Sequence, residues 1–115
     1  MGLCDTVALL ADTVAAAHAP LSAREHALHA RLRAMPQHLA AGDLGAWEAG
    51  YQEAVPDHPA PRLPERLLDD VFDLGRHNLY RAFDVAGTAA EVARVVAVLR
   101  QGGVEVPVIQ PPRTW

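Results

Sequence analysis

The sequence predicts a mainly α-helical domain with a small C-terminal β component (α+β), in which three to four N-terminal helices precede a short βαβ unit. Apolar residues recur at steps of three and four through much of the chain, whereas residues 104–109 alternate as a strand does. An all-α bundle with an extended C-terminal tail is the alternative. The 115 residues fit a single domain, 1–115, with one candidate internal boundary at the proline-rich connection 56–64.

Two helices are predicted at the N-terminal end. Residues 5–18 carry apolar side chains at helical spacing, and Pro20 ends that pattern. Ser22 and Glu25 form a capping box that opens the second helix. Because Pro36 lies within the apolar face of this second helix, we expect either a kink or the start of a new helical turn there.

A third helix is predicted to begin after Gly42. Asp43 is a residue type favoured at the cap of a helix, and the side chains that follow at helical spacing include Trp47 and Tyr51. Two glycines make this segment intrinsically weak as a helix. We therefore expect both aromatic side chains to be packed against other parts of the fold.

A fourth helix is predicted from Glu65, since Pro64 is a favoured residue at the first helical position. Two continuations are open. If Gly75 ends the helix, residues 79–85 form a short strand, which is the interpretation we adopt. Otherwise the helical face continues as far as Phe83.

The C-terminal third is predicted to be a helix over 88–102. Thr88 and Glu91 match a second capping box, and Gly102 with Gly103 supplies the stop. Valine and leucine side chains cover more of this helix than a surface helix normally shows. We therefore expect it to be covered on a second side.

Residues 104–109 are predicted to be a strand that completes the βαβ unit with residues 79–85 and a right-handed crossover. Pro107 lacks a backbone donor, which suits an edge strand. Two strands do not form a stable sheet alone in water. This incomplete sheet and the apolar helix together favour self-association.

Composition excludes several function classes. All ten basic residues are arginines, so the chain has no lysine for a Schiff base or a phosphate-binding loop. The net charge of −4 argues against binding to nucleic acid. The single cysteine, Cys4, cannot form an internal disulfide. Asp69 and Asp73 share one helix face, which we interpret as solvated, and with no catalytic motif an independent enzyme is not expected.

A recognition surface is predicted around the segment 76–81. Arg76 and Arg81 offer forked donors for a carboxylate or a phosphate, Tyr80 offers a rigid aromatic contact, and His77 lies among them. The C-terminal Trp115 is a further candidate contact. The favoured function is therefore that of a small non-catalytic helical protein acting by protein–protein contact, as a homodimer or an accessory or regulatory subunit, without a cofactor.

Two other functions remain open at this point. Glu25, His26 and His29 lie about one helical turn apart, so their side chains could bind one divalent metal ion. The chain would then be a helical protein that handles metal or haem. Gly87 and Thr88 lie near the expected start of the last helix, where backbone amides attract anions. With Gly87 and Thr88 as its anion-binding residues, the chain would be a regulatory module that binds a small ligand on the βαβ unit.

The N-terminal segment matches a short acylation pattern, Met-Gly followed three residues later by Thr, with Cys4 available for a second chain. Residues 7–17 are apolar but contain an aspartate and are far shorter than a membrane-spanning helix. We expect a cytoplasmic protein, attached to a membrane only if Gly2 and Cys4 are acylated.

Overall fold

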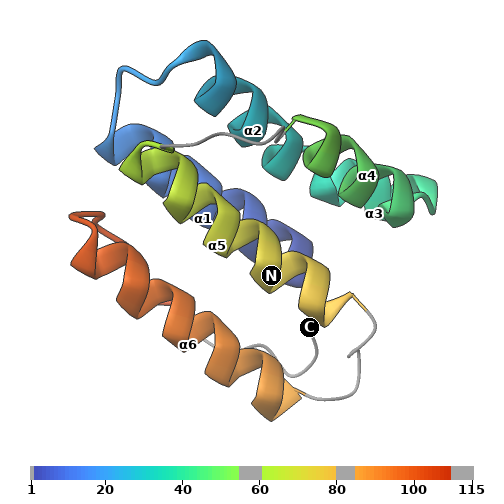
Figure 1. Cartoon of the computed structure of the whole chain (residues 1–115). Coiled ribbons are helices and arrows are strands. Elements are labelled where there is room, and N and C mark those ends of the chain that lie inside the picture. The colour runs from blue at the N-terminus through green and yellow to red at the C-terminus, as the bar shows by residue number, and fades with distance from the viewer. Residues whose placement is uncertain (1, 55–60, 80–84, 110–115) are drawn as a thin grey trace.

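The computed structural model of the chain describes residues 2–54, 61–79 and 85–109, and within these ranges it contains six α-helices and no strand (Figure 1). The helices are α1 (Leu3–Ala17), α2 (Ala23–Arg33), α3 (Met35–Ala41), α4 (Leu44–Ala54), α5 (Leu63–Asn78) and α6 (Val85–Gln101). No described helix is long and apolar enough to cross a membrane.

Helices α1 and α5 lie side by side at the centre of the fold (Figure 1). Helix α2 packs on both of them, and α4 and α3 extend that layer. Helix α6 packs on α5 from the opposite side (Figure 1). The described fold is therefore a helical assembly with a central pair covered on two sides, which agrees with the all-α alternative.

The core is aliphatic, with three aromatic side chains at the α4 end. Trp47 and Tyr51 of α4 and Phe72 of α5 are buried there. The burial of Trp47 and Tyr51 confirms the expectation that this glycine-containing helix is stabilised by packing. Among the described residues, the apolar side chains with no exposed surface are Val7, Leu10, Ala11, Val14, Leu28, Leu32, Met35, Leu68, Val71, Leu74, Val95 and Leu99. Their removal from water is the main favourable contribution to folding.

The local start and stop signals near the N-terminus are confirmed. The Ser22 hydroxyl accepts from the Glu25 amide at 3.1 Å, and the Glu25 carboxylate accepts from the Ser22 amide at 2.8 Å. Pro36 starts a new helix rather than a kink, because it occupies the first turn of α3. Gly42 ends α3 with φ +74°, a conformation that favours glycine.

Two buried carboxylates join the N-terminal ends of α2 and α5. Glu65 pairs with Arg24, and Glu25 lies 3.4 Å from the Arg62 guanidinium. Both carboxylates are almost fully removed from solvent. Because a buried carboxylate is costly without a partner, these two ion pairs fix how α2 meets α5.

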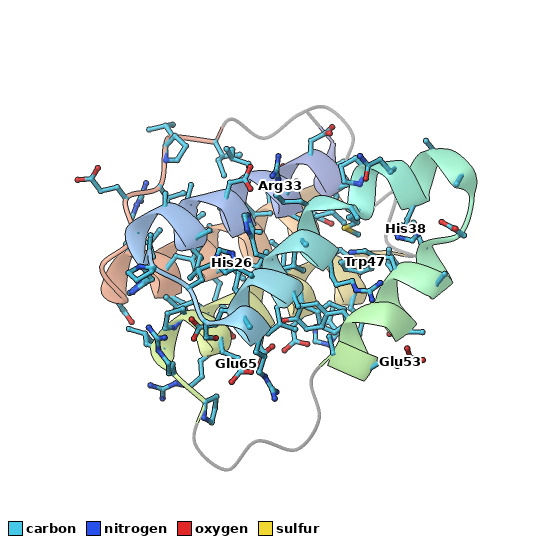
Figure 2. All side chains as sticks on the ribbon, turned by 90° about the horizontal axis from the view of Figure 1, so that it is seen from above. His26, Arg33, His38, Trp47, Glu53 and Glu65 are labelled. Carbon is cyan, nitrogen blue, oxygen red and sulfur yellow. The ribbon has the colours of Figure 1, made fainter. Side chains whose placement is uncertain are left out.

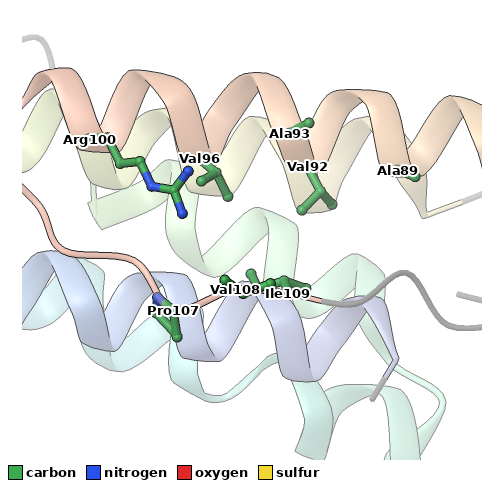
Figure 3. Close-up of a pocket in the computed structure, with 8 residues that line it drawn as sticks. All are labelled: Ala89, Val92, Ala93, Val96, Arg100, Pro107, Val108 and Ile109. Atoms are coloured by element: carbon green, nitrogen blue, oxygen red, sulfur yellow. The ribbon is translucent and has the colours of Figure 1, made fainter.

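The predicted βαβ unit is wrong. Residues 104–109, the C-terminal strap, run back beside α6 as an extended segment, and no described strand pairs with them (Figure 3). Val104 is buried, and Val106 and Ile109 pack against the helical core. The alternation therefore reflects one side of an extended segment packed on helices. Residues 80–84 of the predicted strand 79–85 lie outside the described residues, and Val85 already belongs to α6.

Gly75 does not end α5, which continues through it to Asn78. A Cβ atom at Gly75 would lie 2.9 Å from Cη2 of Trp47 and 3.3 Å from Met35 Cε. The glycine therefore marks a close approach of α5 to the indole of α4. Phe83, the other candidate end of this helix, lies outside the described residues.

The predicted capping box at Thr88 and Glu91 is also wrong, because α6 begins three residues earlier, at Val85. Both side chains hold Asn78 at the end of α5 instead. The Thr88 hydroxyl donates to Asn78 Oδ1 at 3.2 Å, and Asn78 Nδ2 donates to Glu91 Oε2 at 2.6 Å. A sequence pattern that resembled a helix cap is thus a polar contact between two helices.

The C-terminal end of α6 is tied to α1. Gly103 has φ +82°, and the Val104 amide donates to the Leu99 carbonyl at 3.0 Å, which closes the helix. His18 Nε2 lies 3.0 Å from the Gly102 carbonyl oxygen. Of the candidate boundary 56–64, residues 56–60 lie outside the described residues, whereas Leu63 and Pro64 form the first turn of α5.

Candidate functional site

A hollow of about 410 Å³ lies between α4 and α5. It is lined by Tyr51, Gln52, Asp69, Phe72, Asp73 and Arg76. The four residues from α5 are spaced at three, one and three positions, so they occupy a single face of that helix. The hollow therefore arises where this face of α5 meets the aromatic side of α4.

The floor of the hollow is aromatic. The Tyr51 and Phe72 rings stack with centroids 3.9 Å apart and planes 11° apart. The Trp47 ring is tilted against Phe72, with ring centroids 5.2 Å apart, and its Nε1 donates to the Arg31 carbonyl at 2.8 Å. Figure 2 shows Trp47 among the packed side chains and Glu53, from the same helix, at the edge of the molecule.

A short hydrogen bond connects the floor to the acidic side of the hollow. The Tyr51 hydroxyl donates to Asp69 Oδ1 at 2.6 Å. Burial raises the pKa of Asp69, and Glu65 and Asp73 act in the same direction, whereas the Tyr51 hydrogen bond and Arg24 oppose them. Burial also raises the pKa of Tyr51, so its hydroxyl stays protonated and donates.

Arg76 carries the positive charge of the hollow. Its Cζ lies 5.6 Å from the Phe72 ring centroid, a cation–π arrangement, and its Nη2 donates to Asp73 Oδ1 at 3.1 Å. Nη2 also lies 3.3 Å from Nε2 of His77. Arg76 Nε is buried and has no hydrogen-bond partner among the described residues. The guanidinium is thus held by the Asp73 carboxylate, the Phe72 ring and the His77 imidazole.

The structure places only part of the predicted recognition surface. Arg76 lines the hollow, and His77 is exposed beside it. Tyr80, Arg81 and Trp115 lie outside the described residues.

Our prediction from the sequence placed Tyr51 in packed contact without a polar role, and it did not mark Phe72 as part of a site. It also interpreted Asp69 as solvated, although that carboxylate faces Tyr51. The helical spacing from Asp69 to Arg76 was the available signal, because it places acidic, aromatic and basic side chains on one face.

The three predicted metal ligands do not converge. Glu25 is 1% exposed and serves the cap of α2, whereas His26 points to solvent. His29 Nε2 lies 2.7 Å from the Asp12 carboxylate, which also pairs with Arg33 at 3.1 Å. In the part of the chain that the structure describes, no group of three or more His, Cys, Asp or Glu residues is placed to hold a metal ion.

The predicted anion and acylation positions are also engaged elsewhere. Thr88 is buried in the first turn of α6 and donates to Asn78, while Gly87 is half-buried. The Gly2 amide donates to the Asp5 carboxylate at 3.2 Å, and Cys4 is 7% exposed within the core. Burial, followed by the Asp5 charge, raises the pKa of Cys4 to about 11.

A second hollow, of about 310 Å³, lies between α6 and the C-terminal strap (Figure 3). Its lining is mostly apolar: Ala89, Val92, Ala93, Val96, Arg100, Pro107, Val108 and Ile109. Arg100 Nη2 donates to the Val106 carbonyl at 3.2 Å and so ties the strap to α6. The strap covers part of the wide apolar surface that the sequence predicted for this helix.

Comparison with known proteins adds no identification, because no protein-family model, no curated protein and no solved structure matches this chain. The α4–α5 hollow combines a concave surface, an aromatic floor, converging charged groups and carboxyl and hydroxyl groups with raised pKa values. These features together are those expected of a binding site.

Proposed function

We propose that this chain is a small non-catalytic helical protein that acts by protein–protein contact, as an accessory or regulatory subunit or as a homodimer. The α4–α5 hollow is the proposed contact site. One observation carries the proposal: the stacked pair Tyr51 and Phe72 and the charged pair Asp73 and Arg76 converge from two helices on one open hollow. Tyrosine and arginine are enriched at the residues that dominate binding energy in protein interfaces.

The aromatic floor supports this proposal because it is ordered before any partner arrives. Tyr51 is fixed by its stacking on Phe72 and by its hydrogen bond to Asp69. The indole of Trp47 also packs against Phe72. A surface that is rigid in the free protein loses little conformational entropy on binding.

The pairing of the polar groups in the hollow also supports binding over catalysis. A general base or a nucleophile must be able to exchange a proton or attack at working pH. The raised pKa of Tyr51 keeps its hydroxyl protonated, and that hydroxyl is already donated to Asp69. The remaining charged side chains, Asp73 and Arg76, pair with each other.

The test reverses one charge inside the hollow and one outside it. Asp73→Arg changes the hollow directly, whereas Glu53→Arg makes the same change at an exposed position of α4 that does not line it. In a pull-down, we expect wild type and Glu53→Arg to capture the same partner protein and Asp73→Arg to fail to capture it. The captured protein is then purified and titrated, and Asp73→Arg should weaken its binding by about tenfold or more.

Sedimentation of the same three proteins separates the two forms of the proposal. A dimer that Asp73→Arg weakens supports the homodimer, whereas a monomer with an Asp73-dependent partner supports the accessory subunit. A folded monomer from which no partner depends on Asp73 contradicts the proposal. Circular dichroism of each variant verifies that the helices are intact.

A further inference from the structure

The guanidinium of Arg76 lies at the wall of the α4–α5 hollow and covers Phe72 in the way that a positively charged guest would. It lies over the Phe72 ring, with 5.6 Å between Cζ and the ring centroid, and it donates to Asp73 at 3.1 Å. An aromatic face combined with a carboxylate is how proteins commonly hold organic cations. The hollow therefore already contains one cation, and that cation is part of the chain itself.

The contacts that hold Arg76 are weak ones. Its side chain is 34% exposed and that of Asp73 is 42% exposed, so water and salt screen their attraction. Arg76 Nε is buried without a hydrogen-bond partner among the described residues, which leaves one donor of the guanidinium unsatisfied. A guest cation with better-placed donors would therefore compete with Arg76 for Phe72 and Asp73.

The remaining charges of the hollow favour a positive guest. Asp69 and Asp73 supply two carboxylates against the single guanidinium of Arg76. Asp69 receives the Tyr51 hydroxyl at Oδ1, and Asp73 receives Arg76 Nη2 at Oδ1. Both carboxylates thus line the hollow beside Arg76.

Resting on the proposed function, we infer that the partner presents an arginine side chain, whose guanidinium replaces that of Arg76 over Phe72 and against the carboxylates of Asp69 and Asp73. A guanidinium suits the hollow better than an ammonium does. Its planar group stacks on an aromatic ring and donates a fork of hydrogen bonds to a carboxylate. Arg76 is then an internal competitor that covers the Phe72 ring until an arginine-bearing segment arrives.

The test uses an acetylated and amidated Ala-Arg-Ala peptide as the probe. In the wild-type protein labelled with ¹⁵N arginine, the peptide should shift the Nε–H resonance of Arg76 and leave that of Arg66, on the same helix, unchanged. In Arg76→Ala, where the competitor is absent, the peptide should bind about tenfold more tightly than to wild type. Adding Asp73→Asn to Arg76→Ala should reverse that gain.

Two matched peptides define the chemistry. A norleucine peptide has a similar length without charge and should not bind, and a lysine peptide should bind more weakly than the arginine peptide. Equal affinity of wild type and Arg76→Ala for the arginine peptide, or equal binding of the norleucine peptide, overturns the inference. Circular dichroism confirms that each variant is folded.

Failure of this inference is distinguishable from failure of the proposed function. A captured partner that depends on Asp73, together with no binding of the arginine peptide, upholds the protein contact and overturns the guanidinium specificity. Arginine-peptide binding that follows the expected order among the variants, without any Asp73-dependent partner, supports the guanidinium site and contradicts the protein contact.

Discussion

Gly75 of α5 lies directly against the indole of Trp47 of α4. A Cβ atom on this glycine would be 2.9 Å from Trp47 Cη2 and 3.3 Å from both Met35 Cε and Val7 Cγ2. The indole cannot easily yield, because it is buried and its Nε1 is hydrogen-bonded to the Arg31 carbonyl. At Gly75, the packing of α5 against α1 and against the α4 indole therefore leaves room for glycine alone.

We predict that Gly75→Ala lowers the free energy of unfolding by about 1–3 kcal/mol, the usual cost of overpacking a core. Alanine favours a helix by about 1 kcal/mol over glycine, so the net loss would show that the contact with Trp47 outweighs helix propensity. Gly45→Ala is the control, because nothing lies within 4 Å of the added Cβ. In urea denaturation, Gly45→Ala should raise the free energy of unfolding by about 0.5–1 kcal/mol. An equal gain for both variants would contradict the prediction.

The helices that the sequence predicted correctly are those whose signals are local. The Ser22–Glu25 box acts within one turn, and Gly42 ends α3 through its own backbone conformation. The role of Gly75 is not local, since its reason is a tryptophan on another helix. Thr88 shows the converse error, because its spacing to Glu91 matches a cap while its hydroxyl actually reaches α5.

The C-terminal strap was mistaken for a strand because alternation shows only that a segment is extended. Val104 and Val106 contact helices, and no pattern in the segment itself could identify what lies beneath it. The candidate site could not be predicted in full for the same reason. The spacing from Asp69 to Arg76 was visible in the sequence, but the hydrogen bond from Tyr51 joins two helices whose packing the sequence did not predict.

The contact between Thr88 and Asn78 predicts a second stability effect. Thr88→Val keeps the volume of the side chain but removes the hydroxyl that donates to Asn78 Oδ1 in a buried setting. An unsatisfied buried acceptor costs about 1–3 kcal/mol, and we expect the free energy of unfolding to fall by that amount. Thr88→Ser retains the hydroxyl and should therefore lose less of the free energy of unfolding than Thr88→Val does. If valine proves as stable as threonine in urea unfolding, the hydrogen bond contributes nothing.

The environment of Cys4 predicts low thiol reactivity in the folded chain. Burial and the neighbouring Asp5 raise its pKa to about 11, and a thiol reacts through its thiolate. At pH 8 a disulfide reagent should therefore modify Cys4 at least ~100-fold more slowly in the native protein than in urea. An Ala97→Cys variant supplies an exposed thiol on α6 as an internal control. Two well-separated phases are expected, and a single fast phase would refute the burial of Cys4.

The hydrogen bond between Tyr51 and Asp69 gives the last prediction, which concerns pH. Burial raises the pKa of Asp69 in the folded chain above the unfolded value of about 3.9. The folded state then binds more protons than the unfolded state between these two pKa values. Wild-type stability should accordingly increase as the pH falls through that window.

Asp69→Asn isolates this effect, because its side-chain oxygen still accepts the Tyr51 hydroxyl while the buried charge is gone. We expect the variant to be more stable than wild type at pH 7, with an advantage that shrinks as the pH approaches 4. Urea unfolding at several pH values measures the difference. Glu53→Gln, which removes an exposed charge of α4, should differ from wild type by a nearly constant amount. A pH-independent difference for Asp69→Asn, or a loss of stability at neutral pH, would show that burial does not disfavour the Asp69 carboxylate.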